Sequence, residues 1–343
     1  MNQRAIYVTR LRECLTLAVL LLSACAGAGQ DRSTGLAFDA DDWPGTDFSR
    51  SQIDLTEVMS GGVGRDAIPS IDHPRFISFA EYQNIQGIDA MEPVIGLSVN
   101  GEFRAYPLRV MIWHEIVNDV VGDVPVAVTY CPLCNTSVVF DRRVDVRVLE
   151  FGTTGNLRHS DLIMYDRQTE SWWQQYGGQA IVGEYAGHEL DILASRLESL
   201  AEFGDRAPEG QVLVPSDPSA RDYSANPYVG YDRAASPMLF RGKVPRGVSP
   251  MMRVIAINDT AFALPLLQRE GELTHNDLAI NWTAGQRTAL GHRQISSGED
   301  VGSVRVQRKG DDVPHVVTFA FAFFAFHPEG VLFTPQGEVR GGQ

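Results

Sequence analysis

Two cysteines separated by two residues are the side chains of this sequence best suited to chemistry. The run Cys131-Pro132-Leu133-Cys134 joins segments 126–130 and 136–140, which both have the composition of β-strands. The sequence therefore predicts that both sulfurs lie in the tight turn of a β-hairpin. Backbone amides of such a turn can point at the sulfurs, and both thiolates can then bind one metal ion. In thioredoxin-like oxidoreductases, by contrast, the second cysteine continues into a long helix.

Three uses of the Cys131 and Cys134 pair stay open on the sequence alone. Zinc would need further histidine or carboxylate ligands, whereas copper(I) accepts two or three soft ligands. The pair can instead act as a redox dithiol, in which one cysteine attacks and the other resolves the mixed disulfide. A purely structural disulfide is less favoured, because a bridge across so small a loop adds little chain-entropy stabilisation.

His114 is the predicted third ligand or proton carrier for the two cysteines. Apolar residues recur with helical spacing over residues 108–120, so we expect a helix with His114 and Asn118 on one face. The run from His114 to Asn118 lacks the second histidine of the zinc-protease motif His-Glu-x-x-His, which excludes a metalloprotease on that motif. The alternative for His114 is a structural role, which is common for a single helical histidine.

A charged start, an apolar run and small residues predict that residues 1–24 are a secretory signal peptide. The apolar run over residues 15–22 is too short to span a bilayer. Leu22-Ser23-Ala24-Cys25 resembles the lipobox of bacterial lipoproteins, whose chain is cut before the cysteine and then acylated. We therefore expect lipidated Cys25 to anchor the protein to a membrane. The alternative is an ordinary signal that is cut nearby.

The predicted location is the periplasmic face of the cell envelope. Ala26 rather than aspartate follows Cys25, which favours the outer membrane over the inner one. Residues 25–51 are rich in Gly, Asp, Ser and Thr and are predicted to be a flexible tether. The formal charge of −14 disfavours nucleic acid as a partner. A protein or small-molecule partner stays open.

Two segments of the chain predict an internal repeat. Residues 96–108 (GLSVNGEFRAYPL) and 254–266 (VIAINDTAFALPL) align without gaps, and residues 126–130 then match 278–282. Each copy predicts a strand, a turn, a second strand and a following element opened by proline. Where the first copy has its two cysteines, the second has Thr283-Ala284-Gly285-Gln286-Arg287. The fold of the repeat therefore does not require cysteines at this position, which favours a functional role for Cys131 and Cys134.

The predicted fold is α+β and β-dominated, with two related β-rich units. The first unit spans 52–190, a loop-rich connection spans 191–252, and the second unit spans 253–343. The second unit is predicted to be truncated, because it lacks the middle strands of the first. The apolar run over 316–326 is expected to be a central strand of the second unit.

The segment GNLRHSDLIMYDRQTESWWQQ (155–175) is predicted to form strands joined by a turn at Asp166-Arg167-Gln168-Thr169. Trp172 and Trp173 point to opposite faces if their segment is a strand, so we expect one in the core and one exposed or lining a cleft. The following glutamines are expected to be solvated.

Five motifs together resemble the domain-of-unknown-function 3179 family of bacterial and archaeal proteins: RAYPL, WHEIVND, VTYCPLCNTSVVFDR, GNLRHSDLIMYDRQTESWWQQ and AIVGE. The resemblance covers residues 93–333 and implies little about activity, since the family is named for an unknown function. The sequence contains no phosphate-binding loop and no G-x-S-x-G motif, so it gives no support for a nucleotide-binding protein or a serine hydrolase. We are left with a lipid-anchored envelope protein carrying a metal or redox site at Cys131 and Cys134. The alternative is a tethered binding or scaffold module with a structural disulfide.

Overall fold

The computed structural model describes residues 35–342. The predicted signal peptide, Cys25 and residues 26–34 of the predicted tether lie outside this range. The β-dominated fold is confirmed, with 39% strand and 14% helix. Across the described range, no helix has the length and apolar character needed to cross a bilayer.

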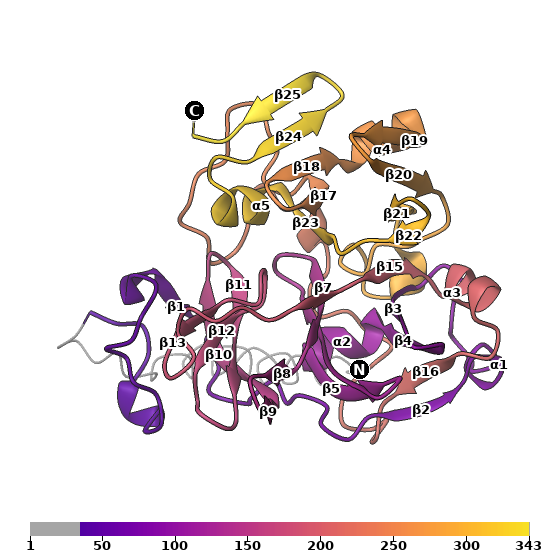
Figure 1. Cartoon of the computed structure of the whole chain (residues 1–343). Coiled ribbons are helices and arrows are strands. Elements are labelled where there is room, and N and C mark those ends of the chain that lie inside the picture. Colours follow the sequence, from indigo (N-terminus) through magenta and orange to yellow (C-terminus); the bar gives the residue numbers. More distant parts are fainter. Residues whose placement is uncertain (1–34, 343) are drawn as a thin grey trace, which may run out of the picture.

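The N-terminal strands occupy the lower half of Figure 1, and the C-terminal strands, in orange and yellow, occupy the upper half. One sheet of the lower half has the order β15-β3-β4-β16-β2. In that order its strands span Ser195–Ser199, Pro93–Val99, Glu102–Pro107, Gln211–Val214 and Arg75–Ser78. A short helix directly follows three of these strands: α1 (Phe79–Tyr82), α2 (Leu108–His114) and α3 (Leu200–Arg206).

A second sheet runs through both halves of the molecule in the order β25-β24-β18-β17-β23-β7-β6-β5, with β14 also paired to β7. Four strands of the lower half belong to it: β5 (Ile116–Val121), β6 (Val124–Cys131), β7 (Thr136–Asp141) and β14 (Ile192–Leu193). The upper half supplies β17 (Arg253–Ile257), β18 (Thr260–Ala263), β23 (Val316–Phe319), β24 (Val331–Thr334) and β25 (Gly337–Arg340). The two halves join where Val317 of β23 pairs with Ser137 of β7.

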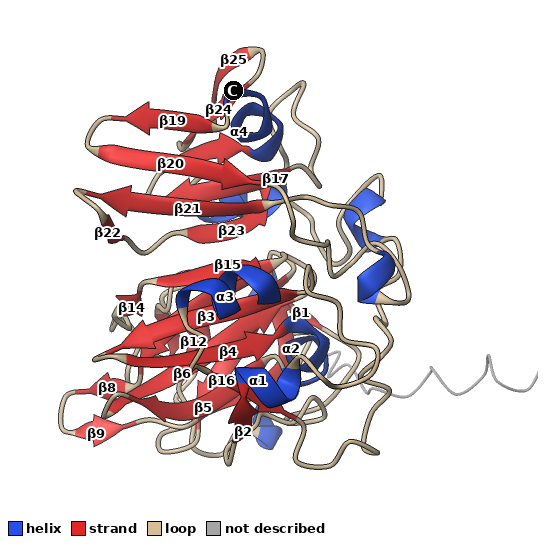
Figure 2. Cartoon of the chain, turned by 90° about the vertical axis from the view of Figure 1, so that its right-hand side faces the viewer, coloured by secondary structure: helices blue, strands red, loops and turns tan. Residues whose placement is uncertain are grey.

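The third sheet lies in the lower half and has the order β1-β10-β11-β12-β13. Its strands span Val58–Ser60, Phe151–Arg158, Asp161–Asp166, Trp172–Gln174 and Ala180–Val182. The upper half has its own sheet of β19 (Glu272–His275), β20 (Leu278–Thr283), β21 (Ser303–Arg308) and β22 (Asp311–Asp312), whose strands lie side by side in the upper part of Figure 2. A small ribbon of β8 (Arg143–Val144) and β9 (Arg147–Val148) completes the strands.

The two halves share one arrangement of strands, which favours the predicted repeat. The order β15-β3-β4-β16 in the lower half corresponds to β23-β17-β18-β24 in the upper half. In each set the last two strands are parallel, and a seven-residue helix follows the first strand: α3 below and α5 (Ala320–Phe326) above. The turns of the two hairpins begin at Asn100 and Asn258, with φ of 49° and 54°. Within the described chain, the upper half has no counterpart of β10 to β13.

Two predicted segments turn out differently in the structure. Residues 192–214 are not part of a loop-rich connection, because β14, β15 and β16 pair with strands of the first unit. The stretch without strands is limited to residues 215–252. The apolar run 316–326 is only half strand: β23 ends at Phe319 and α5 follows. A run that is buried on every side fits a strand and a helix equally well, so its pattern could not tell them apart.

The predicted tether is ordered in its described part, residues 35–51. Phe38 and Trp43 are buried, and together with Phe48 they place their rings 4.8–5.3 Å from the ring of Trp172. The expectation that one of the two tryptophans is exposed is therefore wrong. Trp173 lies in the main core, whereas Trp172 faces the other side of the sheet and is covered by this N-terminal segment.

Candidate metal centre

The cysteine pair lies in the turn of the β6–β7 hairpin, as the sequence predicts. Cys131 is the last residue of β6 and pairs with Thr136, the first residue of β7. The chain reverses over four residues, and Asn135 adopts a positive φ of 52° that asparagine tolerates well. The Asn135 amide donates to the Pro132 carbonyl at 3.2 Å. Cys131 and Cys134 are free thiols, and both are buried, so the turn is packed inside the fold.

Contacts from the upper half hold this turn in place. The carbonyl oxygen of Cys134 accepts hydrogen bonds from the Phe319 amide at 3.0 Å and from the Thr318 hydroxyl at 3.1 Å. The Tyr231 hydroxyl donates to the Leu133 carbonyl at 3.0 Å. The position of the sulfurs therefore depends on residues that are about 100 or more positions away in the chain.

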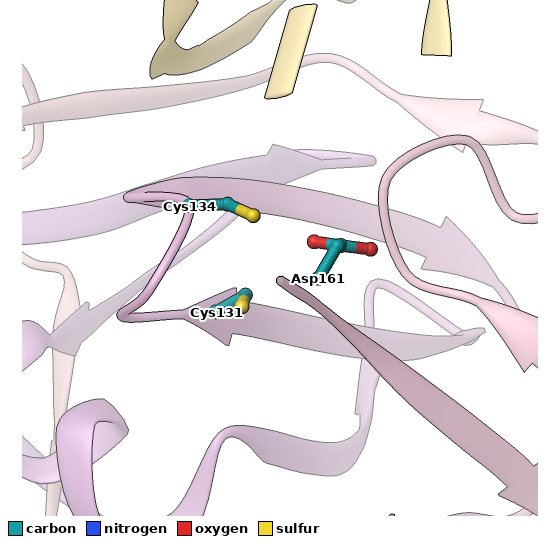
Figure 3. A group of neighbouring side chains, drawn as sticks. All are labelled: Cys131, Cys134 and Asp161. Carbon is teal, nitrogen blue, oxygen red and sulfur yellow. The ribbon is translucent and has the colours of Figure 1, made fainter. Parts of the chain in front are cut away.

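Asp161 completes a group of three potential metal ligands. One ligand atom from each of Cys131, Cys134 and Asp161 lies within 4.8 Å of the other two, and all three residues are buried. Figure 3 shows their side chains converging from the end of β6, the hairpin turn and the start of β11. A two-residue turn at His159 and Ser160 places Asp161 there, and both residues have the positive φ that a type I′ turn requires.

One carboxylate oxygen of Asp161 is held and the other is free. Oδ2 accepts hydrogen bonds from Gln174 Nε2 at 2.7 Å and from the Tyr176 amide at 2.9 Å. Oδ1 is buried and accepts no hydrogen bond from an N–H or O–H group of the described residues, so the thiols beside the carboxylate are its only weak donors among them. The Ser160 and Tyr176 hydroxyls are also buried without a partner in the described part of the chain. Gln174 itself is buried, which corrects the expectation that the glutamines are solvated. An unpartnered buried carboxylate oxygen is a costly feature unless a ligand occupies it.

A fourth acidic group, Glu115, lies near this group. Burial raises the pKa of the Cys131 thiol, and it raises the pKa of Cys134 well above the ordinary value. Burial raises the pKa of Asp161 to about 7, although its hydrogen bonds oppose the shift. The pKa of Glu115 rises to about 8, through burial and then through the charge of Asp161. In the described chain, no basic side chain forms an ion pair with either carboxyl group.

The structure does not bring His114 into the group. Its Nδ1 lies 2.8 Å from the Pro69 carbonyl oxygen and its Nε2 lies 2.8 Å from the Tyr223 hydroxyl, so both ring nitrogens have partners elsewhere. Burial lowers the pKa of His114. The predicted helix face is also wrong: α2 ends at His114, and Asn118 lies in β5.

Sequence analysis missed both carboxyl groups of this region. Asp161 is one of several polar residues in the predicted strands of residues 155–175, and no sequence spacing links it to the cysteines. Glu115 falls within the helix predicted over residues 108–120, whereas in the structure it follows α2 with a φ of 59°. A comparison of the two repeat copies offers a signal for Glu115, because glycine follows the corresponding helix α4 (Leu264–Glu270) at Gly271.

A cavity of about 170 Å³ borders this region, and Glu115 and Cys131 are among its lining residues. The donor set beside it, two thiols and one carboxyl, fits zinc, which binds cysteine, histidine and carboxylate ligands. It fits copper(I) less well, because that ion prefers soft donors alone. Three protein ligands are also the number found where zinc keeps one position open.

Fold and site together define a β-rich protein with a buried cysteine–carboxylate cluster at the junction of its two halves. The family described as "Protein of unknown function (DUF3179)" matches residues 65–330, which is most of the chain. The protein therefore belongs to this family. No curated protein and no solved structure matches the chain.

Proposed function

We propose that Cys131, Cys134 and Asp161 bind one divalent metal ion, with zinc as the best fit to their donor atoms. The observation that carries this proposal is the Asp161 carboxylate, which is buried beside two thiols and whose Oδ1 accepts no hydrogen bond from an N–H or O–H group of the described residues. That oxygen could coordinate a bound cation, which would stabilise the ionised forms of the two thiols and the carboxyl group.

The charge of the region supports the same proposal. Three potential ligands and Glu115 are acidic and buried, and no described basic side chain forms an ion pair with them. A buried negative charge is strongly unfavourable unless a positive charge or hydrogen bonds compensate it. A divalent ion held by two thiolates and a carboxylate supplies that compensation.

A redox dithiol is the second candidate for the same pair, and the burial of the thiols weighs against it. Attack on a disulfide needs a thiolate, whereas burial raises the pKa of both thiols. Both cysteines are also buried, which limits contact with the disulfide of a protein partner.

We infer from the predicted signal and lipobox that this centre faces the periplasm on a protein anchored through lipidated Cys25. The outer membrane is the favoured location. The absence of aspartate after Cys25 and the length of the apolar run before it support this inference.

Elemental analysis of the purified protein tests the metal proposal. We expect about one zinc per chain, and near-complete loss of zinc in Cys131→Ser and Asp161→Asn. Asp166→Asn is the matched control, because Asp166 is a buried carboxylate at the other end of β11 and lies outside the group of three. Thiol titration without reductant is the second readout. Two free thiols that zinc protects support the centre, whereas a metal-free protein with an intact disulfide contradicts it.

A further inference from the structure

Glu115 occupies a backbone position that the other half of the molecule fills with glycine. Its amide donates to the Met111 carbonyl at 2.7 Å, and its carbonyl accepts from the Tyr130 amide at 2.8 Å. Gly271 makes the corresponding two bonds, to Leu267 and from Trp282, each at 2.8 Å. The φ angles are 59° and 71°. A side chain is strained in this left-handed region and glycine is not, so the backbone does not explain the glutamate.

The surroundings of the Glu115 carboxyl group do not explain why a glutamate occupies this position either. Glu115 is 7% exposed, and the described residues provide its carboxyl with no hydrogen-bond donor and no cation. Its charged neighbour is Asp161, which is also acidic. A carboxyl group that is strained, desolvated and unpartnered costs stability, and such features gather where a ligand binds.

The carboxyl lies at the wall of the 170 Å³ cavity, which Cys131 also lines. Three further polar residues line the cavity: Thr153, Asn156 and Tyr228. Most of the remaining wall is apolar and consists of Val63, Ile68, Leu133, Leu157, Leu162 and Leu239. Val63 and Met238 both line the cavity and are 43% and 48% exposed, so this part of the cavity wall lies at the surface of the molecule. This is the composition of a small-molecule site, with an apolar body and few polar groups.

A glycine brings one side of this cavity close to the sheet. Gly155 in β10 has a φ of 76°, and a Cβ there would come within 2.2 Å of the Val63 carbonyl oxygen. The loop that carries Val63 therefore packs directly on the β10 backbone. The cavity is a built feature of the fold, with one wall fixed by this close approach.

We propose that the cavity binds a small, largely apolar molecule with a hydrogen-bond-donating head group, such as an alcohol or amine, placed between Glu115 and Cys131. The inference deepens the proposed function and rests on it, because Cys131, one of the three proposed metal ligands, lines the cavity. A carboxylate is disfavoured, because it would have to lose its bound water in a mostly apolar cavity that already carries the acidic groups of Glu115 and Cys131. The cavity is smaller than the pockets that hold drug-sized ligands.

Saturation-transfer NMR with three four-carbon probes tests the site on the zinc-loaded protein. We expect 1-butanol and n-butylamine to bind in the millimolar range and butyrate to bind at least about ten-fold more weakly. Met238→Trp should abolish binding by closing the mouth. Val120→Trp is the control, because Val120 is 49% exposed and does not line the cavity. Glu115→Gly should weaken the binding of 1-butanol and n-butylamine, because their head groups lose the carboxyl partner while the backbone is kept.

Three outcomes would overturn this inference: no probe binds, butyrate binds as well as butanol, or Met238→Trp leaves binding unchanged. Zinc content measured in the same samples separates this inference from the proposed function. A protein that holds zinc but binds no probe contradicts the pocket alone. A protein that binds the probes but holds no zinc at Cys131, Cys134 and Asp161 contradicts the metal centre alone.

Discussion

The hydroxyl of Thr318 donates a 3.1 Å hydrogen bond to the carbonyl oxygen of Cys134, across the boundary between the two halves of the molecule. The same hydroxyl lies 2.9 Å from that of Thr136, the first residue after the cysteine turn. All three residues are buried. The half of the molecule that lacks cysteines thus supports the turn that carries them.

Thr318→Val should weaken both the fold and the centre. The substitution keeps the shape but leaves the Thr136 hydroxyl without its partner, at a cost of about 1–2 kcal/mol in the free energy of unfolding. Zinc affinity should fall as well, because the turn loses one of its supports. Urea denaturation and competition with a chelator measure the two effects. Thr260→Val is the control: Thr260 lies in β18 and bonds to neighbouring Asp259. Equal zinc affinity in wild type and Thr318→Val would contradict this role.

Gln174 should position Asp161 for metal binding. Gln174→Met removes the amide that holds Oδ2 and should lower zinc affinity about 10- to 100-fold, as is usual when a partner of a metal ligand is lost. Gln175→Met is the matched control, because the adjacent buried glutamine donates to Thr129 and Thr136 instead. Chelator competition measures both variants, and a similar loss of affinity in the two would point to general destabilisation.

Glu115→Gly should stabilise the metal-free protein. The change relieves the left-handed backbone and removes a buried carboxyl, which together contribute about 1 kcal/mol or more to the free energy of unfolding. Gly271→Glu places the same side chain at the corresponding position and should destabilise the fold. Denaturant unfolding after metal removal checks both variants. A lower stability for Glu115→Gly would show that the carboxyl has a structural role.

The metal-free protein should lose stability as the pH rises through about 7 to 8. The pKa values of Asp161 and Glu115 are raised to about 7 and about 8 in the folded state, from 3.8 and 4.5. Folding therefore favours their protonated forms, and that contribution is full below the ordinary values and disappears as the pH passes the raised ones. Unfolding free energies from pH 5 to 9 check this, and the slope should shrink in Glu115→Gly.

Zinc affinity should change with pH in the opposite direction. The thiols and Asp161 must lose their protons to bind the ion, so binding tightens as the pH rises. Titration of the metal-free protein with zinc from pH 6 to 8 measures this trend. A binding constant that does not vary over this range would contradict ligation by groups with raised pKa values.

Cys25→Ala should release the protein from the membrane fraction. Acyl chains on Cys25 provide the predicted attachment, so removing the acceptor thiol removes the anchor. Fractionation of cells that express each form, followed by mass spectrometry of the N-terminal peptide, checks the outcome. A wild-type N-terminus without acyl groups would instead support an ordinary signal peptide.

The sequence predicted the part of the site that is formed by residues close together in the chain. The Cys131–Cys134 turn between two strands follows from the flanking residues, because the turn residues and the strand-forming residues on both sides define a hairpin. Asp161 reaches the sulfurs only through the pairing of β10 with β11 and through the packing of two sheets. Neither contact can be predicted from the spacing of residues in the sequence. His114 lies close to the cysteines in sequence, but its ring points to Pro69 and Tyr223.

The fold was predictable to a similar extent. Asn100 and Asn258 mark matching turns in the two halves, and the β-dominated class follows from such patterns. The helical spacing over 108–120 continued past the real end of α2, because buried strand β5 is also apolar. The N-terminal segment has the polar composition of a linker, yet Phe38 and Trp43 suffice to fix it on Trp172. A few aromatic contacts outweigh the average composition of a segment.

The pairing of β23 with β7 should hold the two halves together even after a protease cuts the chain between them. The strand-free stretch 215–252 is the covalent link between the halves, whereas a shared sheet and the hydrogen bonds to the cysteine turn connect them non-covalently. A single cut in that stretch would leave two fragments that remain associated under native conditions and separate only in denaturant.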